Sequence, residues 1–179
     1  MQKPGRYAGG EYNIIIKEDA IVKMAISYPD LYEVGMSNNG IRILYDRINA
    51  IQGIQCERVF SVAPDFSQLL KEKQFPLYTL ETYTPLNELD CLGFNVAHEL
   101  LITNILQILD LGVIPLMAQE RSDNNPIIIG GGAGVSNPLP YIKFFDLFFL
   151  GDGEEAIYEI AECLVLSKEQ NKNRIDTIN

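Results

Sequence analysis

The chain alternates strand-like and helix-like segments from residue 21 to residue 167. Two of the strand-like segments, DCLGFNVA (90–97) and PIIIGGG (126–132), are apolar on both faces, which is typical of central strands in a parallel sheet. The segment HELLITNILQILDLG between them has apolar residues at helical spacing and ends at Gly112, a common helix stop. This alternation predicts one α/β domain in which helices cover both faces of a parallel sheet.

Three further segments complete the predicted sheet. IVKMAISYP (21–29), IQCERVF (54–60) and DLFFL (146–150) read as strands, and IPLMAQ (114–119) could form one more short strand. Between the first two strands, residues 41–48 have helical spacing. Because crossovers between parallel strands are right-handed, few topologies remain. We predict a three-layer, doubly wound, mainly parallel five-stranded sheet of the flavodoxin-like or Rossmann-like type, with the strand order 2-1-3-4-5.

The chain is expected to have three parts. Residues 1–20 form a lead-in that packs on the domain, residues 21–167 form the α/β domain, and residues 168–179 form a polar tail without periodicity. A domain of this length buries about two-thirds of its unfolded surface and needs no disulfide or metal to fold. The cysteines at positions 56, 91 and 163 are odd in number and form no C-x-x-C pair, so we predict that they are small buried hydrophobes.

Charge and hydropathy limit the partners and the location. The formal net charge is −10 at pH 7. This field repels nucleic acids and anionic membranes, so we expect neither to be a direct partner of the domain. No apolar run reaches the roughly 18 residues of a membrane-spanning helix. The N-terminal sequence MQKPGRYAGGEYN lacks the apolar core of a secretory signal, so we expect a cytoplasmic location.

The loops at the carboxyl ends of the strands are the candidate binding site, because ligands of doubly wound sheets bind there. In IIIGGGAGVSNP, glycines let backbone N–H groups approach a ligand closely, although a plain tight turn explains the same residues. The segment matches neither the dinucleotide fingerprint nor the P-loop. The candidate ligand-binding residues are Ser37, Asn95, Val96, Gly130, Gly131, Gly132, Ser136, Asn137, Gly151, Asp152, Gly153 and Glu154.

The side chains at these loops indicate binding without catalysis. The carboxylates of GDGEE (151–155) disfavour phosphate and suit amide or hydroxyl donors, although acidic residues also stabilise the first turn of any helix. His98 is the only histidine, so a multi-histidine metal site is excluded, and we expect it to have a local hydrogen-bonding or capping role. We predict no catalytic residue and no metal ligand.

The order of these motifs resembles a known family. GGAGVSNPLP followed by FFDLFFLGDGEE resembles the N-terminal cobalamin-binding-type domain of radical SAM proteins, in which G-G-x-x-x-x-N-P precedes D-x-x-x-x-G-E-G-E. Here Asp152 replaces the first glutamate of the second motif. RYAGGEYN, PDLYEVGMSNNGIRILY, CERVF and HELLITNILQILDLGVIP are similar to one subfamily of these proteins, so the resemblance runs from Arg6 to about Ile160.

The resemblance implies a Rossmann-like domain that precedes a radical SAM barrel in the same polypeptide, and that barrel is the expected partner. Such a barrel holds an iron–sulfur cluster on C-x-x-x-C-x-x-C and cleaves S-adenosylmethionine. This motif does not occur here, so both groups would be bound outside this chain, and the parent protein rather than this domain would be the enzyme. Relatives that ligate cobalt from below carry D-x-H-x-x-G after the first strand. PDLYEVG stands there instead, so ligation by a lower histidine is not expected. Cobalamin could still bind without it, or the domain has kept the fold and lost the ligand.

Two other functions fit the same residues. The domain could be a non-catalytic interaction module that docks the barrel or its substrate, and exposed apolar surface around the four loops, with no crevice, would favour this. It could also bind a small nucleotide or a flavin, although the missing phosphate fingerprint and the acidic last loop disfavour this function.

Overall fold

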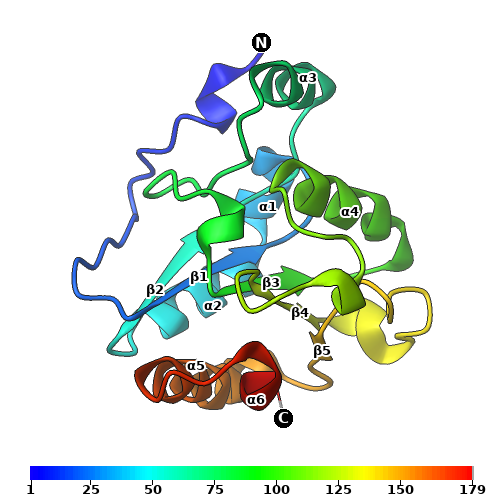
Figure 1. The fold of residues 1–179 in the computed structure, drawn as a ribbon. Helices are drawn as coiled ribbons and strands as arrows, with labels where there is room; N and C mark the ends of the chain where they lie inside the picture. The colour runs from blue at the N-terminus through cyan, green and yellow to red at the C-terminus, as the bar shows by residue number, and fades with distance from the viewer. Residues whose placement is uncertain (179) are drawn as a thin grey trace.

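The computed structural model describes residues 1–178, apart from the side chain of Glu154. A five-stranded sheet forms the centre of the molecule, and all its strand pairs are parallel (Figure 1). Its order is β2-β1-β3-β4-β5. The strands are β1 (Val22–Ser27), β2 (Ile54–Arg58), β3 (Cys91–Asn95), β4 (Ile127–Gly131) and β5 (Leu147–Phe148). The predicted fold class and strand order are therefore confirmed.

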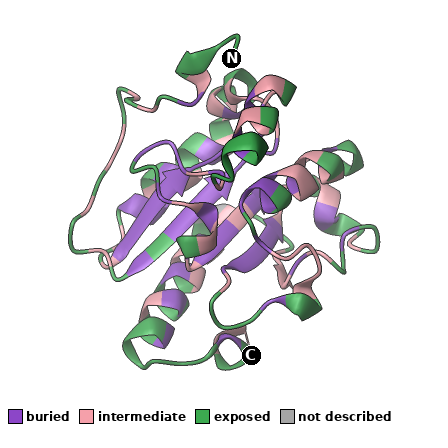
Figure 2. Cartoon of the chain, turned by 45° about the horizontal axis from the view of Figure 1, so that its top comes forward, coloured by how far each residue is buried: buried purple, intermediate pink, exposed green. Residues whose placement is uncertain are grey.

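Helices cover both faces of this sheet and complete three layers. They are α1 (Tyr32–Ser37), α2 (Asn39–Asn49), α3 (Pro64–Lys73), α4 (Ile102–Leu111), α5 (Gly153–Glu169) and α6 (Arg174–Ile178). Apolar residues of α3 and α4 pack with Ala25 on one face, and those of α2 and α5 pack with Met24 on the other. Successive strand residues point to opposite faces, so strands between two helical layers are apolar on both. Figure 2 shows the buried sheet and the exposed outer sides of the helices.

Asn38 caps the amino end of α2. Its Oδ1 accepts a hydrogen bond from the backbone N–H of Ile41 at 3.0 Å. We expect Asn38→Ala to lower the free energy of unfolding by about 1 kcal/mol, because a helix N–H loses its acceptor. Urea denaturation measures this change. The exposed neighbour Asn39 is the control, since Asn39→Ala removes no cap, and an equal loss in both variants would contradict the capping role.

Two segments differ from the sequence prediction, and a buried arginine lies in or beside each. Residues 114–119 form no strand; a 3₁₀ turn (Ala118–Glu120) lies there instead. The carbonyl groups of Pro115 and Leu116 accept from Arg121, at 3.0 and 2.9 Å, rather than from a neighbouring strand. The predicted polar tail is helical for most of its length, because α5 runs to Glu169 and α6 follows it. In α6, Arg174 is buried.

The lead-in runs along the edge strand β2, as Figure 1 shows. Backbone groups of Ile15 and Lys17 bond to the side chain of Gln55, each at 2.8 Å. The N–H of Ile15 also donates to the Tyr45 hydroxyl at 2.8 Å. An uncovered edge strand is a template for pairing with other chains. The lead-in covers this edge through side chains, without forming a strand of its own.

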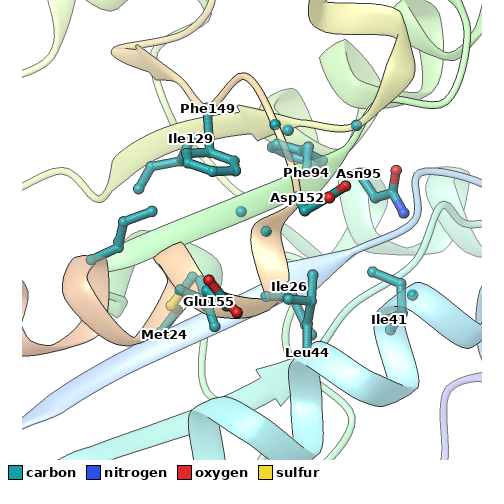
Figure 3. Close-up of a pocket in the computed structure, with 18 residues that line it drawn as sticks. Met24, Ile26, Ile41, Leu44, Phe94, Asn95, Ile129, Phe149, Asp152 and Glu155 are labelled. Carbon is teal, nitrogen blue, oxygen red and sulfur yellow. The ribbon is translucent and has the colours of Figure 1, made fainter.

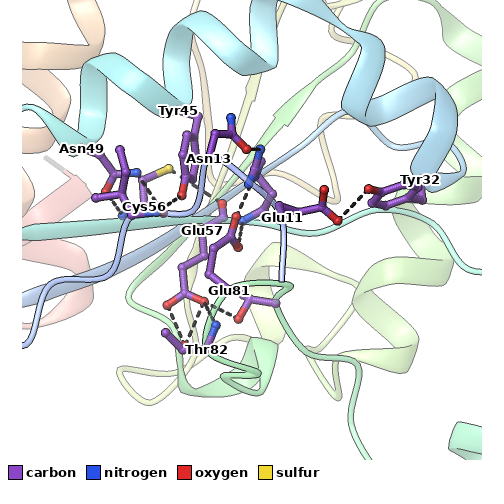
Figure 4. A network of polar contacts seen from close by, with 12 residues as sticks. Glu11, Asn13, Tyr32, Tyr45, Asn49, Cys56, Glu57, Glu81 and Thr82 are labelled. Atoms are coloured by element: carbon purple, nitrogen blue, oxygen red, sulfur yellow. Dashed lines mark hydrogen bonds and ion pairs between the residues drawn. The ribbon is translucent and has the colours of Figure 1, made fainter. Parts of the chain in front are cut away.

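A buried ion pair lies under the lead-in (Figure 4). Arg58 Nε is 2.6 Å from Glu81 Oε1, and the two side chains are 1% and 0% exposed. Glu81 also accepts from the backbone N–H of Arg58 at 2.7 Å. The guanidinium lies over the ring of Tyr45, 4.2 Å from its centroid, and donates to Asn13. Burial raises the pKa of Glu81, and the contacts with Arg58 oppose this change. Arg58 is the cation that pairs with this buried carboxylate.

The three cysteines do not share one environment. Cys56 and Cys91 are buried, as predicted, and burial raises the pKa of both thiols, so neither is a reactive thiolate. The prediction is wrong for Cys163, which is exposed on α5. The apolar stripe of α5 passes through Ile157, Ala161 and Leu164, and residue 163 lies off that stripe.

Candidate functional site

A cleft opens at the carboxyl ends of β1, β3 and β4, on the face of the sheet that carries α2 and α5 (Figure 3). Its volume is about 630 Å³, within the range of roughly 300–1,000 Å³ that is usual for cofactor sites. The strand order changes direction between β1 and β3, and ligands of doubly wound sheets bind beside this point. The cleft therefore lies where this fold places ligands.

The floor of the cleft is a slot with no side chains at its centre. Gly93 of β3 lies between Ile26 of β1 and Ile129 of β4, and Gly131, two residues beyond Ile129, lies on the same face. A Cβ added at Gly131 would meet no atom within 4 Å. At Gly93 it would meet only ordinary contacts, the nearest at 3.4 Å from Met24. The two glycines expose the backbone of two central strands to the cleft, where a flat group could lie against it.

The walls above this slot are apolar. Ile41 and Leu44 come from α2 (Figure 3), and Ile157 and Ile160, which also line the cleft, come from α5. These residues belong to the apolar faces by which the two helices pack on the sheet and on each other. The cleft is thus a gap in that helix–sheet packing layer. Its depth favours an apolar group, and a phosphate there would lose its hydration without a cationic partner.

Polar groups gather at the mouth. Asn95 ends β3, Asp152 is the residue before α5, and Glu155 lies in the first turn of that helix. None of these three side chains forms a hydrogen bond or ion pair with another residue in the described part of the chain. Asn95 offers a donor and an acceptor, whereas the two carboxylates only accept when ionised. The mouth therefore suits a ligand that presents amide or hydroxyl donors.

The backbone at the mouth needs glycine. Gly132 has a φ of 100°, and a Cβ there would lie 2.6 Å from Asn95 Oδ1 and 2.9 Å from the carbonyl oxygen of Val96. Gly151 has a φ of 127°, which also favours glycine. These two positions let β4 and β5 turn away sharply at the edge of the cleft. For them, the tight-turn explanation of the glycine run is sufficient, whereas Gly131 has open space beside it.

The structure brings together about half of the predicted binding residues. Those that line the cleft are Asn95, Gly131, Gly132, Gly151, Asp152 and Gly153. Those that do not are Ser37, Val96, Gly130, Ser136 and Asn137. The side chain of Glu154 lies outside the described residues. For the residues in either group, a contact with a ligand stays a prediction.

The pleat of the strands explains part of this division. Gly131 faces the cleft, so Gly130 faces the opposite layer, where a Cβ would lie 3.0 Å from Phe145. Val96 is fully buried in that same layer. Ser37 donates to the carbonyl of its own helix at Val34. Ser136 and Asn137 are exposed on the turn after β4.

Sequence reasoning missed the slot and the walls. Gly93 carried a usable signal, since glycine is disfavoured inside a central strand and marks close approach of a ligand or backbone. The wall residues gave no such signal, because the sequence pattern of an apolar helix face is the same whether that face packs on the sheet or lines a cleft. Their role appears only when α2 and α5 are placed.

Other chemistry is sparse around the cleft. His98 is exposed at the start of a 3₁₀ turn and does not line the cleft. Within residues 1–178, no group of three or more His, Cys, Asp or Glu side chains is placed to hold a metal ion. Among the described helices, none is long and apolar enough to cross a membrane.

A parallel sheet between two helical layers, with a cleft beside the reversal of strand order, defines the Rossmann-like class of α/β domains. Within this class, residues 40–179 match the family described as radical SAM proteins, N-terminal. This match covers most of the chain, which therefore belongs to that family of N-terminal domains. No curated protein and no solved structure matches the chain.

Proposed function

We propose that this domain binds a corrinoid in the cleft as the accessory domain of a radical SAM enzyme. The observation that carries the proposal is the slot at Gly93 and Gly131, which opens the centre of the sheet beside the reversal of strand order. The family supports the setting, since radical SAM proteins hold an iron–sulfur cluster and S-adenosylmethionine, here expected outside this chain. A bound corrinoid supplies a cobalt centre that can carry an alkyl group.

The residues of the cleft fit such a group in part of its structure. A corrinoid is a large ring system with amide side chains and a tail. The cleft is apolar at its walls and open at the strand backbone, so it suits a flat portion of the ligand. Asn95, Asp152 and Glu155 at the mouth suit amide N–H donors. The cleft volume of about 630 Å³ accommodates only part of so large a ligand.

A lower imidazole ligand is not part of this proposal. The segment after β1 holds no histidine, and His98, the only histidine of the chain, does not line the cleft. We therefore expect the visible spectrum of a bound corrinoid to lack the changes that coordination by a protein imidazole produces. His98→Ala is expected to leave both spectrum and affinity unchanged. A spectrum that depends on His98 would contradict this part of the proposal.

The testing experiment is a corrinoid titration of the 179-residue chain, followed by visible absorbance and calorimetry. We expect saturable binding that Gly131→Val weakens by at least about 100-fold, because the new side chain fills the slot and a steric clash of roughly 3 kcal/mol corresponds to that factor. Gly5→Val is the matched control. A Cβ at Gly5 also meets open space, but Gly5 does not line the cleft.

Three outcomes would change this assignment. Absence of saturable binding by the wild-type chain would contradict corrinoid binding by this chain. Equal weakening by Gly131→Val and Gly5→Val would place the ligand elsewhere. Tight binding of a flavin or nucleotide in the same titration, lost on Gly131→Val, would favour the nucleotide-binder alternative despite the acidic mouth.

A second function is favoured by a separate observation, the exposed leucines at the same edge. Leu100, Leu139 and Leu150 follow β3, β4 and β5, and they are 82%, 75% and 65% exposed. Side chains of this kind mark contact surfaces when they gather on one face. We propose that the radical SAM barrel of the same polypeptide docks there. In the full-length protein, Leu100→Lys with Leu139→Lys should speed proteolysis between the two domains, and unchanged cleavage would contradict this.

A further inference from the structure

The rim of the cleft depends on a very short strand. β5 pairs with β4 at two positions, Ile129 with Leu147 and Gly130 with Phe148. Two flanking hydrogen bonds extend this pairing, from the N–H of Asp146 to Ile128 and from the N–H of Phe149 to Gly130. An edge strand of two residues is weakly held by its ladder alone. Its position must therefore be set by side chains.

Phe149, Gly151 and Asp152 follow β5 directly and line the cleft. Any shift of β5 along or away from β4 would carry this rim with it. The φ of 127° at Gly151 fixes where the chain turns into α5. The shape of the mouth is thus tied to the residues that hold β5.

Asp146, the residue before β5, is the main point of attachment. Its Oδ2 accepts from the backbone N–H of Ile128 in β4 at 2.7 Å and from Arg121 at 2.9 Å. It also accepts from Arg174 of α6. The Asp146 side chain is 5% exposed, and those of Arg121 and Arg174 are 0% and 7% exposed. Removing one partner of such a buried ion pair is strongly destabilising, because the other charge stays buried without compensation.

α6 supplies one of these partners from the amino end of the sheet. Arg174 also donates to the carbonyl groups of Asn125 and Pro126, at 2.7 and 2.9 Å. Its backbone N–H donates to Asp123 at 2.9 Å. One side chain of a five-residue helix therefore joins the segments that lead into β4 and β5. If α6 leaves, these acceptors lose their donor and β5 loses part of its attachment.

We propose that α6 controls the rim of the cleft through Asp146, which acts as a positioning residue. With Arg174 in place, β5 and the rim at residues 149–153 are fixed; with α6 released, they loosen. Because coupling between two sites is reciprocal, a ligand in the cleft should in turn hold α6 in place. This last consequence rests on the proposed function, whereas the coupling of α6 to the rim does not.

The test is hydrogen exchange on the ligand-free chain. We expect Arg174→Ala to raise the exchange rates of the Asp146 and Phe149 amides, which donate to β4, by about tenfold or more, since they become part of a locally opening unit. Arg174→Lys should restore part of the protection, because it keeps the charge but not the forked donor. Ile175→Ala is the control in the same helix; Ile175 is 68% exposed and should leave the rim unchanged.

The outcomes separate the coupling from the proposed function. If Arg174→Ala frees α6 while exchange at the Asp146 and Phe149 amides stays at the wild-type rate, the coupling is overturned. If the rim loosens as expected, the wild-type chain and the same variants are then titrated with a corrinoid. Binding of the corrinoid to the wild-type chain should slow exchange in residues 170–178. A chain that binds no corrinoid but shows the loosened rim contradicts the proposed function and keeps the coupling. Binding without slower exchange in residues 170–178 overturns the reciprocal link.

Discussion

Glu81→Ala is expected to lower the free energy of unfolding by about 3–5 kcal/mol, because it leaves the charge of Arg58 buried without its partner. The pair is almost completely buried, and the guanidinium of Arg58 is enclosed by Tyr45 and Asn13. The backbone N–H of Arg58 loses its acceptor in the same variant. Urea denaturation, read by circular dichroism, measures the change. A typical domain is stable by only about 5–15 kcal/mol, so this loss would be a large fraction of the total.

Two further variants separate the buried charge from a general effect of substitution. Asp110→Ala breaks the exposed pair with Lys71, and we expect it to cost at most about 1 kcal/mol. Arg58→Met combined with Glu81→Gln removes both charges and keeps an acceptor for the N–H of residue 58. This double variant should be more stable than Glu81→Ala alone, because no unpaired charge remains. If it is less stable, the loss in Glu81→Ala does not come from the unpaired charge.

The same ion pair shows where sequence reasoning stops. The alternation of IQCERVF correctly indicates a strand, yet Glu57 and Arg58 are both buried. Thr79 and Thr82 supply hydroxyl donors to Glu57, and Glu81 supplies the counter-charge to Arg58. These partners lie more than twenty residues further along the chain. The alternation of polar and apolar residues indicates a strand from those residues alone. It does not show that distant residues cover the polar side chains of Glu57 and Arg58.

The strand order was predictable because it depends on few choices. Once five strands alternate with helices, the handedness of crossovers leaves a small number of sheets. The short β5 was found through DLFFL, although only Leu147 and Phe148 pair. The cleft lies at the carboxyl ends of the strands, the edge at which doubly wound sheets bind ligands. The floor of the cleft was not predicted. Gly93 opens a slot only because of the side chains of β1 and β4 that flank it, and the strand register that places them is not visible in the sequence.

The family match and the structure divide the chain differently. The match begins at residue 40, inside α2, whereas β1 (Val22–Ser27) is the strand between β2 and β3. Without β1 the sheet would be split, and Met24 and Ile26 would be missing from the floor of the cleft. The structural domain therefore includes residues before the matched region. An expression variant that begins at residue 40 is expected not to fold, which circular dichroism would reveal.

Gly93→Val is expected to raise stability and to remove ligand binding, two effects of opposite sign. Glycine inside a strand costs about 0.5–1 kcal/mol relative to alanine, and valine is favoured in strands. The new Cβ would meet Met24 at 3.4 Å and Ile26 at 3.6 Å, which are ordinary contacts. We therefore expect the free energy of unfolding to rise by about 1 kcal/mol. Corrinoid affinity should fall by at least about 100-fold, since the methyl groups occupy the slot.

Gly93→Ala provides the graded comparison, with a smaller gain in stability and a smaller loss of affinity. If valine lowers stability, its methyl groups clash with neighbours such as Met24 and Ile26, and the space beside Gly93 is too small to be a slot. If valine stabilises the fold and leaves affinity unchanged, the ligand does not lie against β3. The expected combination has a clear physical meaning. Glycine then stands in a central strand where a larger side chain would fit and would stabilise the fold. The space that it leaves beside the sheet is occupied by a ligand rather than by a side chain of the chain itself.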